Sequence, residues 1–248
     1  MKSLSVIGFG QFGQLAARHL KAHFDVLAHD PAPGAPAAAR GLGVAFGTLE
    51  AAAACDVVVV AVPVPAMEGV FKALAPRLRP GALVIDVGSV KMLPVAWMKA
   101  HLPEHVDLVA THPLFGPQSA RDGLQGLRFV VCPVRGDRHE AVAAFGRAQG
   151  LAVTVTTPEE HDREMAYVQA LTHLIGRSLV NLNIPDEQLK TVSYQHLLEL
   201  CSLIGADTFE LFTAIQTQNP FAAEVVEAFV GEARSLLDQV AKARLGPR

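Results

Sequence analysis

The sequence predicts an α/β protein in which a doubly wound parallel sheet is followed by an all-α C-terminal domain. Short apolar runs alternate with helical patterns through residues 1–157, which is typical of a parallel sheet with helices on both faces. A glycine-rich turn follows the first apolar run, and from residue 158 onwards the pattern is helical. We therefore expect two domains, residues 1–157 and 158–248.

Composition and charge exclude several classes of protein. The 248 residues are 50% hydrophobic, and the net charge is −3. Lysine and arginine do not cluster in the sequence, so nothing indicates a basic surface that binds nucleic acid. No apolar run approaches the roughly 20 residues of a membrane helix, and Met1-Lys2 leads directly into an expected strand, so we expect no signal peptide. Three scattered cysteines, mostly in apolar surroundings, indicate buried thiols in a reducing compartment. We expect a cytoplasmic protein.

The glycine-rich turn reads Gly8-Phe9-Gly10-Gln11-Phe12-Gly13, between an expected strand and an expected helix. In this context Gly8 permits a tight turn, Gly10 lets a pyrophosphate approach the backbone, and Gly13 lets helix and strand pack closely. The pattern predicts a Rossmann-type fold that binds NAD. The alternative is a glycine-rich turn without a ligand. The cofactor-binding candidates here are Gly8, Gly10, Gln11, Phe12 and Gly13.

Asp30 ends the second expected strand, where a carboxylate meets the adenosine ribose in this type of fold. A carboxylate there accepts hydrogen bonds from the ribose hydroxyls and repels a 2′-phosphate, so we expect NAD rather than NADP. The alternative is an Asp that caps the loop before Pro31. Val62 and Pro63 close the apolar run Asp56–Val62, at the position where a loop passes under the nicotinamide ribose.

Two further strand ends, Asp86–Lys91 and Thr111–Pro117, are expected to face the same crevice and to supply the chemistry. A neutral His112 could take a hydroxyl proton while hydride leaves for the nicotinamide, and its ordinary pKa of about 6.5 suits this role. Ser89 offers a hydroxyl beside it. The alternatives are a helix-capping Ser89, a solvated Lys91 and a core histidine at position 112.

Three segments resemble, in order and spacing, the prephenate/arogenate (cyclohexadienyl) dehydrogenase family of tyrosine biosynthesis. They read D-V-G-S-V-K (86–91), T-H-P-L-F-G-P (111–117) and H-D-R-E-M-A-Y-V-Q-A-L-T-H (161–173), and with the glycine turn the match covers essentially the whole chain. The resemblance implies NAD-dependent oxidative decarboxylation of arogenate to tyrosine, of prephenate to 4-hydroxyphenylpyruvate, or of both. His112 would be the base and Ser89 would align the substrate hydroxyl with it.

The resemblance also implies that the helical domain forms the substrate wall and a homodimer. It assigns substrate contacts to Gln169, Thr172 and His173, although Thr172 could equally be a polar residue at a helix seam. Ungapped matching places Gln195 where members that prefer prephenate carry an arginine, which favours arogenate or a broad specificity. Arg121 and Arg128 are the alternative cations for a substrate carboxylate.

Two other functions remain open. A hydroxyacid or imine dehydrogenase would share the N-terminal fold, but its usual lysine base has no convincing counterpart here. A non-catalytic NAD-sensing module would explain the glycine turn and Asp30 but not Ser89, His112 and His173. We expect no metal site, because His101 and His105 lie on either side of Pro103 and do not share a helix face.

Overall fold

The computed structural model describes residues 1–244, and the chain divides into two compact units, Met1–His161 and Asp162–Arg248. The boundary that we expect from the sequence, between residues 157 and 158, falls at the start of a helix, whereas the two units meet inside that helix. None of the described helices combines the length and the apolar character that a membrane crossing requires.

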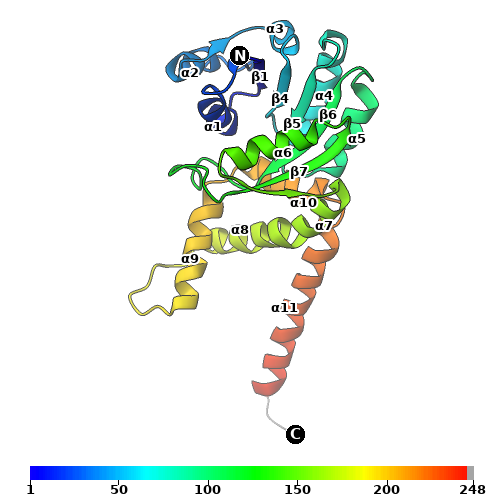
Figure 1. The fold of residues 1–248 in the computed structure, drawn as a ribbon. Coiled ribbons are helices and arrows are strands. Elements are labelled where there is room, and N and C mark those ends of the chain that lie inside the picture. The colour runs from blue at the N-terminus through cyan, green and yellow to red at the C-terminus, as the bar shows by residue number, and fades with distance from the viewer. Residues whose placement is uncertain (245–248) are drawn as a thin grey trace. The chain divides into compact units, whose positions relative to one another are not determined.

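The first unit contains an eight-stranded sheet with the order β3-β2-β1-β4-β5-β6-β7-β8 (Figure 1). Every pair of neighbouring strands is parallel except β6 and β7. The order reverses between β1 and β4, which is the switch point where ligands bind in open α/β sheets. The strands are β1 Ser3–Ile7, β2 Asp25–His29, β3 Ala45–Phe46, β4 Val57–Val60, β5 Leu83–Asp86, β6 Asp107–Pro113, β7 Arg128–Arg135 and β8 Ala152–Val155.

Helices cover both faces of this sheet, as the alternating pattern predicts. Successive strand residues point to opposite faces, so in β4 Val58 and Val60 pack against α3, α4 and α5, while Val57 and Val59 belong to the core formed with α1, α2 and α6. This two-sided burial explains the uninterrupted valines of β4. The helices are α1 Gln11–Leu20, α2 Ala35–Leu42, α3 Leu49–Ala53, α4 Val64–Leu74, the 3₁₀ turn η1 Ala75–Arg77, α5 Met92–His101 and α6 His139–Ala148.

Strand β6 is longer than the apolar run 106–110 suggests. It continues to Pro113 because the antiparallel strand β7 pairs with its end, so that His112 lies opposite Val130. His112 is therefore a strand residue and not part of the following loop. Helix α4 begins at Val64, directly after Pro63.

The second unit is helical, and the structure describes no strand in it. It contains the C-terminal part of α7 (Pro158–Met165), the π-helix η2 (Ala166–Leu171), α8 (Thr172–Leu182), α9 (Val192–Gly205), α10 (Phe209–Gln218) and α11 (Ala222–Arg244). The breaks between α8 and α9, α9 and α10, and α10 and α11 contain Pro185, Asp207 and Pro220 respectively.

Helix α7 starts with a capping box formed by Thr157 and Glu160. The Thr157 hydroxyl accepts the Glu160 N–H at 3.1 Å, and the Glu160 carboxylate accepts the Thr157 N–H at 3.2 Å. These hydrogen bonds, with one from the Thr156 hydroxyl as the largest cause, lower the pKa of Glu160. The hydroxyl cap and the proline in the first turn that the sequence predicts are therefore both present.

The π-helix corrects one expectation. The sequence suggests one regular α-helical stripe through His161, Gln169, Thr172 and His173, but Gln169 lies in η2 and α8 begins only at Thr172. A π-helical turn closes i→i+5 hydrogen bonds and so rotates everything after it. The spacing of these four residues therefore does not describe a single helix face.

Candidate active site

The glycine turn between β1 and α1 has the shape that a dinucleotide phosphate requires. Gly8 has φ of 93°, and a side chain there would reach within 2.5 Å of the Ala61 carbonyl oxygen, while a side chain at Gly13 would overlap the Gly8 carbonyl oxygen. Gly10 instead faces open space, with no atom within 4 Å of a Cβ built on it. Gly10 is the N-cap of α1 and provides no side-chain cap, so the turn offers backbone amides to an anion. These features fit the pyrophosphate of NAD.

Asp30 ties the glycine turn to the end of β2. One carboxylate oxygen accepts the Phe9 N–H at 2.6 Å and the other accepts the Ala32 N–H at 2.7 Å. The loop-capping role that we gave as the alternative is therefore present. The contact with ribose hydroxyls stays a prediction.

The other cofactor candidates lie around the same turn. Val62 follows β4, and its Cγ1 atom is 2.9 Å from the Cβ position built on Gly8, while Pro63 is the N-cap of α4. Gln11 begins α1, and the Phe12 ring lies 6.4 Å from the ring of Phe115 in the loop after β6. The structure therefore brings these residues together at the switch point of the sheet.

A buried ion pair joins the ends of β5 and β6. Lys91 and Asp86 are both 0% exposed, and the Lys91 ammonium donates to the Asp86 carboxylate and, at 2.6 Å, to the Thr111 carbonyl. The Thr111 hydroxyl donates to the Asp86 carbonyl at 2.6 Å. Burial raises the pKa of Asp86, and the ammonium opposes this change. The expectation that Lys91 could be a solvated side chain is therefore wrong.

Ser89 lies between these two charged residues in the sequence and is 8% exposed. Helix α5 begins at Met92 with Lys91 as its N-cap, so Ser89 does not have the capping role that we considered as its alternative. The Ser89 hydroxyl has no hydrogen-bond partner among the described residues. A buried hydroxyl in this state is uncommon, which indicates a group available to a ligand.

His112, 5% exposed, lies at the end of β6 beside the strand that leads to Ser89, with Asp86 opposite Ala110 in the register. Its Nδ1 atom is 2.8 Å from the Nε2 atom of His161, which is itself 2% exposed. Burial holds the pKa of His112 well below its ordinary value, and the charges of His161 and Lys91 act in the same direction. The imidazole is therefore neutral at pH 7, as a general base requires.

His161 is a site residue that sequence reasoning missed. Its place at the start of the H-D-R-E segment and its spacing from Gln169, Thr172 and His173 were signals, but they did not indicate a contact with His112. A hydrogen bond between residues 49 positions apart could not be inferred from that spacing.

The second unit contains a separate polar cluster around His173. His173 Nδ1 lies 3.7 Å from an Asp207 carboxylate oxygen, and Arg177 donates to the Asp207 carbonyl at 2.6 Å. Gln169 Oε1, His173 Nδ1 and Arg177 Nε are buried without hydrogen-bond partners among the described residues. Burial lowers the pKa of His173, which Asp207 opposes and Arg177 reinforces. Asp207 and Arg177 were not predicted as site residues, because Asp207 reads from the sequence only as part of a turn.

The remaining substrate candidates lie elsewhere in the described chain. Thr172 is half-buried at the start of α8, and Gln195 lies on α9, where its amide donates to Glu199 at 3.4 Å. Arg121 is 79% exposed and pairs with Asp122, and Arg128 is exposed at the start of β7. Neither arginine belongs to a buried polar cluster.

No group of three His, Cys, Asp or Glu residues among residues 1–244 is arranged to hold a metal ion. His101 instead lies 3.0 Å from Glu68, and His105 lies 3.2 Å from the Leu78 carbonyl oxygen.

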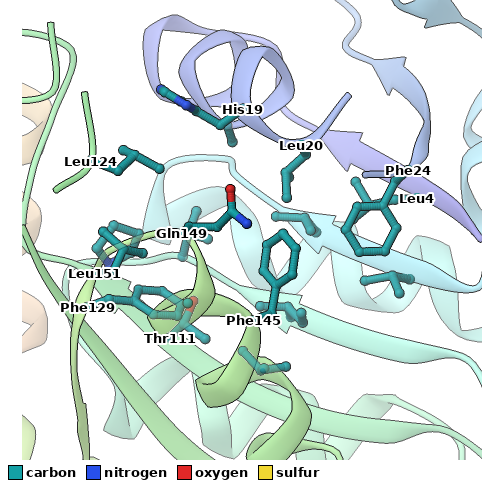
Figure 2. Close-up of a pocket in the computed structure, with 18 of the residues that line it drawn as sticks. Leu4, His19, Leu20, Phe24, Thr111, Leu124, Phe129, Phe145, Gln149 and Leu151 are labelled. Carbon is teal, nitrogen blue, oxygen red and sulfur yellow. The ribbon is translucent and has the colours of Figure 1, made fainter. Parts of the chain in front are cut away.

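A pocket of about 370 Å³ lies over the sheet between α1 and α6 (Figure 2). Most of its lining side chains are apolar, among them Leu20, Phe24 and Phe145, with Gln149 beside them. Thr111 and Pro113 line it, and because strand residues alternate between faces, His112 projects from the opposite face. The candidate active site is therefore defined by its polar residues and not by this apolar hollow.

The fold and the site together define a Rossmann-type dinucleotide-binding protein with a helical second unit. The chain belongs to the prephenate dehydrogenase family. Residues 16–149 match the model of its nucleotide-binding domain, and residues 157–245 match the model of its dimerization domain.

Relatives with similar names agree with this assignment. The chain is 34% identical over 237 residues to arogenate dehydrogenase 2, chloroplastic, of Arabidopsis thaliana, covering 90% of this chain and 66% of that protein. It is 32% identical over 216 residues to a probable arogenate/prephenate dehydrogenase of Methanocaldococcus jannaschii, covering 81% of this chain and 48% of that protein. The chain therefore spans about half to two thirds of the length of these relatives.

The fold also resembles that of prephenate dehydrogenase from Aquifex aeolicus, solved with hydroxyphenyl propionate and NAD+. The TM-score is 0.79 at 21% sequence identity, covering 99% of this chain and 93% of that one. At this identity the likeness concerns the fold.

Proposed function

We propose that this chain catalyses the NAD-dependent oxidative decarboxylation of arogenate, prephenate or both, with a preference for arogenate. The observation that carries the proposal is the neutral, buried His112 at the end of β6, in an otherwise dinucleotide-binding fold. Among the described residues, no hydrogen bond occupies its Nε2 atom, which leaves that lone pair for a substrate hydroxyl.

In the proposed reaction, His112 Nε2 takes the proton of the ring hydroxyl as the O–H bond breaks. NAD supplies the hydride acceptor when bound. The hydroxyl of Ser89, which has no partner in the described chain, holds the substrate oxygen in line with the imidazole. The resulting ring ketone lies para to the quaternary carbon, and loss of carbon dioxide from that carbon is driven by aromatisation.

The polar cluster of the second unit supports the preference for arogenate. Arogenate carries an ammonium and a carboxylate on its side chain, whereas prephenate carries a keto group and a carboxylate. Asp207 would pair with the ammonium and Arg177 with the carboxylate, since arginine is suited to carboxylates. A keto group would leave the half-buried Asp207 carboxylate without a cation from the substrate, which is costly.

Asp30 supports NAD over NADP as the cofactor. Its carboxylate, anchored by the Phe9 and Ala32 amides, would place a negative charge at the adenosine ribose. A 2′-phosphate there would meet like charge.

We also infer that the chain forms a homodimer and acts in the cytoplasm. The match of residues 157–245 to a dimerization domain supports the first inference, together with exposed Leu236, Leu237 and Val240 on α11. The three cysteines form no disulfide among the described residues, which supports a reducing compartment.

The test is NADH formation with arogenate and with prephenate, side by side, repeated with NADP. We expect kcat/KM for arogenate to exceed that for prephenate at least about tenfold, and NAD to be preferred to NADP. The Asp207→Asn variant should lose arogenate turnover while prephenate turnover stays level or rises. A reversed preference would overturn the role of Asp207, and preference for NADP would overturn that of Asp30. No turnover of either substrate would indicate a hydroxyacid or imine dehydrogenase or a non-catalytic module.

A further inference from the structure

Two buried imidazoles from different parts of the first unit are joined in the site. His112 comes from β6 and His161 from α7, and their ring centroids lie 5.0 Å apart at an interplanar angle of 65°. The hydrogen bond joins Nδ1 of His112 to Nε2 of His161 at 2.8 Å. Both side chains are at least nine-tenths buried, so bulk water cannot readily replace either partner.

This contact restricts which nitrogen carries the proton. A neutral imidazole has one N–H donor and one acceptor nitrogen, so one ring of the pair must donate and the other must accept. If His112 donates from Nδ1, its Nε2 keeps a lone pair and can act as a base. If His161 donates instead, His112 carries its proton on Nε2 and cannot accept one from a substrate.

We infer that His161 is a positioning residue that accepts the Nδ1–H of His112, and so keeps the Nε2 lone pair of His112 directed at the substrate hydroxyl. The inference rests on the proposed function. When Nε2 takes the substrate proton, His112 becomes an imidazolium whose Nδ1–H still points at His161. The acceptor therefore stabilises the charge at the moment it forms.

Other charged groups near the pair do not offer this acceptor. The Lys91 ammonium donates to Asp86 and to the Thr111 carbonyl beside His112, and it carries a positive charge that disfavours imidazolium. Asp86 is engaged by Lys91 and by the Gly88 N–H. Asp162, next to His161 in the chain, is fully buried, and its carbonyl accepts from Asn219. His161 is thus the group that the structure places within hydrogen-bond distance of Nδ1 of His112.

A matched pair of variants separates positioning from packing. Gln can place its amide oxygen near the position of Nε2 of His161, whereas Met has a similar length but only a weak acceptor. We expect His161→Met to lower kcat about 10²-fold with little change in KM, and His161→Gln to stay within about fivefold of the unmodified chain. Equal kcat in the two variants would overturn the inference.

The pH dependence of kcat/KM is a second test, because it would not change if His161 only packed against His112. In His161→Met the Nδ1–H of the His112 imidazolium lacks a strong acceptor, so we expect the acid limb of kcat/KM to lie at lower pH than in His161→Gln, which keeps an acceptor. Coincident acid limbs in the two variants would contradict the inference. Urea unfolding of both variants checks that they fold.

Histidine ¹⁵N NMR tests the same assignment without turnover. We expect His112 of the unmodified chain to carry its proton on Nδ1, and this tautomer to become mixed in His161→Met. A His112 protonated on Nε2 would overturn the inference even if the enzyme is active. A chain with the Nδ1–H tautomer but no turnover of either substrate would instead refute the proposed function and leave the positioning role intact.

Discussion

The first unit buries several ionisable side chains next to one another at one edge of its sheet. Burial lowers the pKa of His112, and the charge of Lys91 acts in the same direction. Lys91 in turn is held by Asp86, so the buried charge beside the base is compensated. Removing one partner of such a pair is costly because it leaves the other charge buried and unpaired.

The lowered pKa of His112 predicts the pH dependence of activity. Because the folded-state pKa lies below the ordinary value of about 6.5, the base stays neutral as the pH falls through 6.5. We expect the acid limb of kcat/KM to lie below pH 6.5, with loss of activity only when the pH passes the lowered pKa. The unfolded chain binds the proton first, so this group also costs stability below pH 6.5. Rate and urea-unfolding profiles between pH 4.5 and about 8 measure both effects.

The control for this profile is His112→Asn. It should abolish turnover at every pH, and NAD binding should persist. An acid limb above pH 6.5 in the unmodified chain would mean that the environment of His112 favours its charged form.

At the scale of elements, two glycines of the β1–α1 turn differ in the space that a side chain would have. Gly13 is required by packing, since any side chain would overlap the Gly8 carbonyl oxygen. Gly10 has φ of −68° and ψ of −165°, which alanine also adopts, and it has open space around it. The fold itself therefore does not require glycine at position 10.

Two alanine substitutions test this difference. Gly13→Ala should lower the free energy of unfolding by about 1–3 kcal/mol because the turn must shift. Gly10→Ala should leave the unfolding free energy nearly unchanged but weaken NAD binding at least about tenfold, because its methyl group occupies the approach of the pyrophosphate. Urea unfolding and titration calorimetry with NAD measure the two quantities. Unchanged NAD affinity in Gly10→Ala would place the phosphates elsewhere.

The π-helix is the second element that shapes a site. It lies between α7 and α8 and carries Gln169, one turn before His173. π-helical turns are frequent at functional sites because they change the direction of the side chains that follow. Here the turn precedes a buried cluster that includes unpaired atoms of Gln169, His173 and Arg177.

At the scale of the whole molecule, the chain leaves apolar side chains on its helical unit uncovered. On α11, Leu236, Leu237 and Val240 are 53%, 69% and 49% exposed. An exposed group of large apolar residues on one helix is typical of a surface that another protein chain covers.

These exposed apolar residues predict that negative charges introduced on α11 will prevent dimer formation. Replacing Leu236, Leu237 and Val240 together by Glu should halve the mass measured by light scattering, because carboxylates cannot be buried at an apolar interface without a partner. The matched control replaces Ser235 and Gln239, exposed polar residues of the same helix, by Glu, and it should keep the dimer mass. A dimer that survives the triple change would place the interface on other residues.

The sequence by itself determined the features that depend on near neighbours in the chain. Alternation of apolar runs and helical patterns predicts the doubly wound sheet, and the glycine spacing with Asp30 predicts the dinucleotide turn. The Thr157 cap and the turn residues predict where the later helices begin and end. These features follow from backbone sterics and from the periods of 2 and 3.6 residues, which act over a few residues.

Only the tertiary structure decided which distant side chains meet. It placed His161 on His112 and Asp207 beside His173, and it buried Lys91 against Asp86 where the sequence allowed a solvated lysine. The length of β6 and the π-helix also departed from the local pattern, because pairing with β7 extended the strand and a change of helical period rotated the residues after it. Such contacts depend on how strands and helices pack in three dimensions, and residue spacing along the chain does not determine that packing.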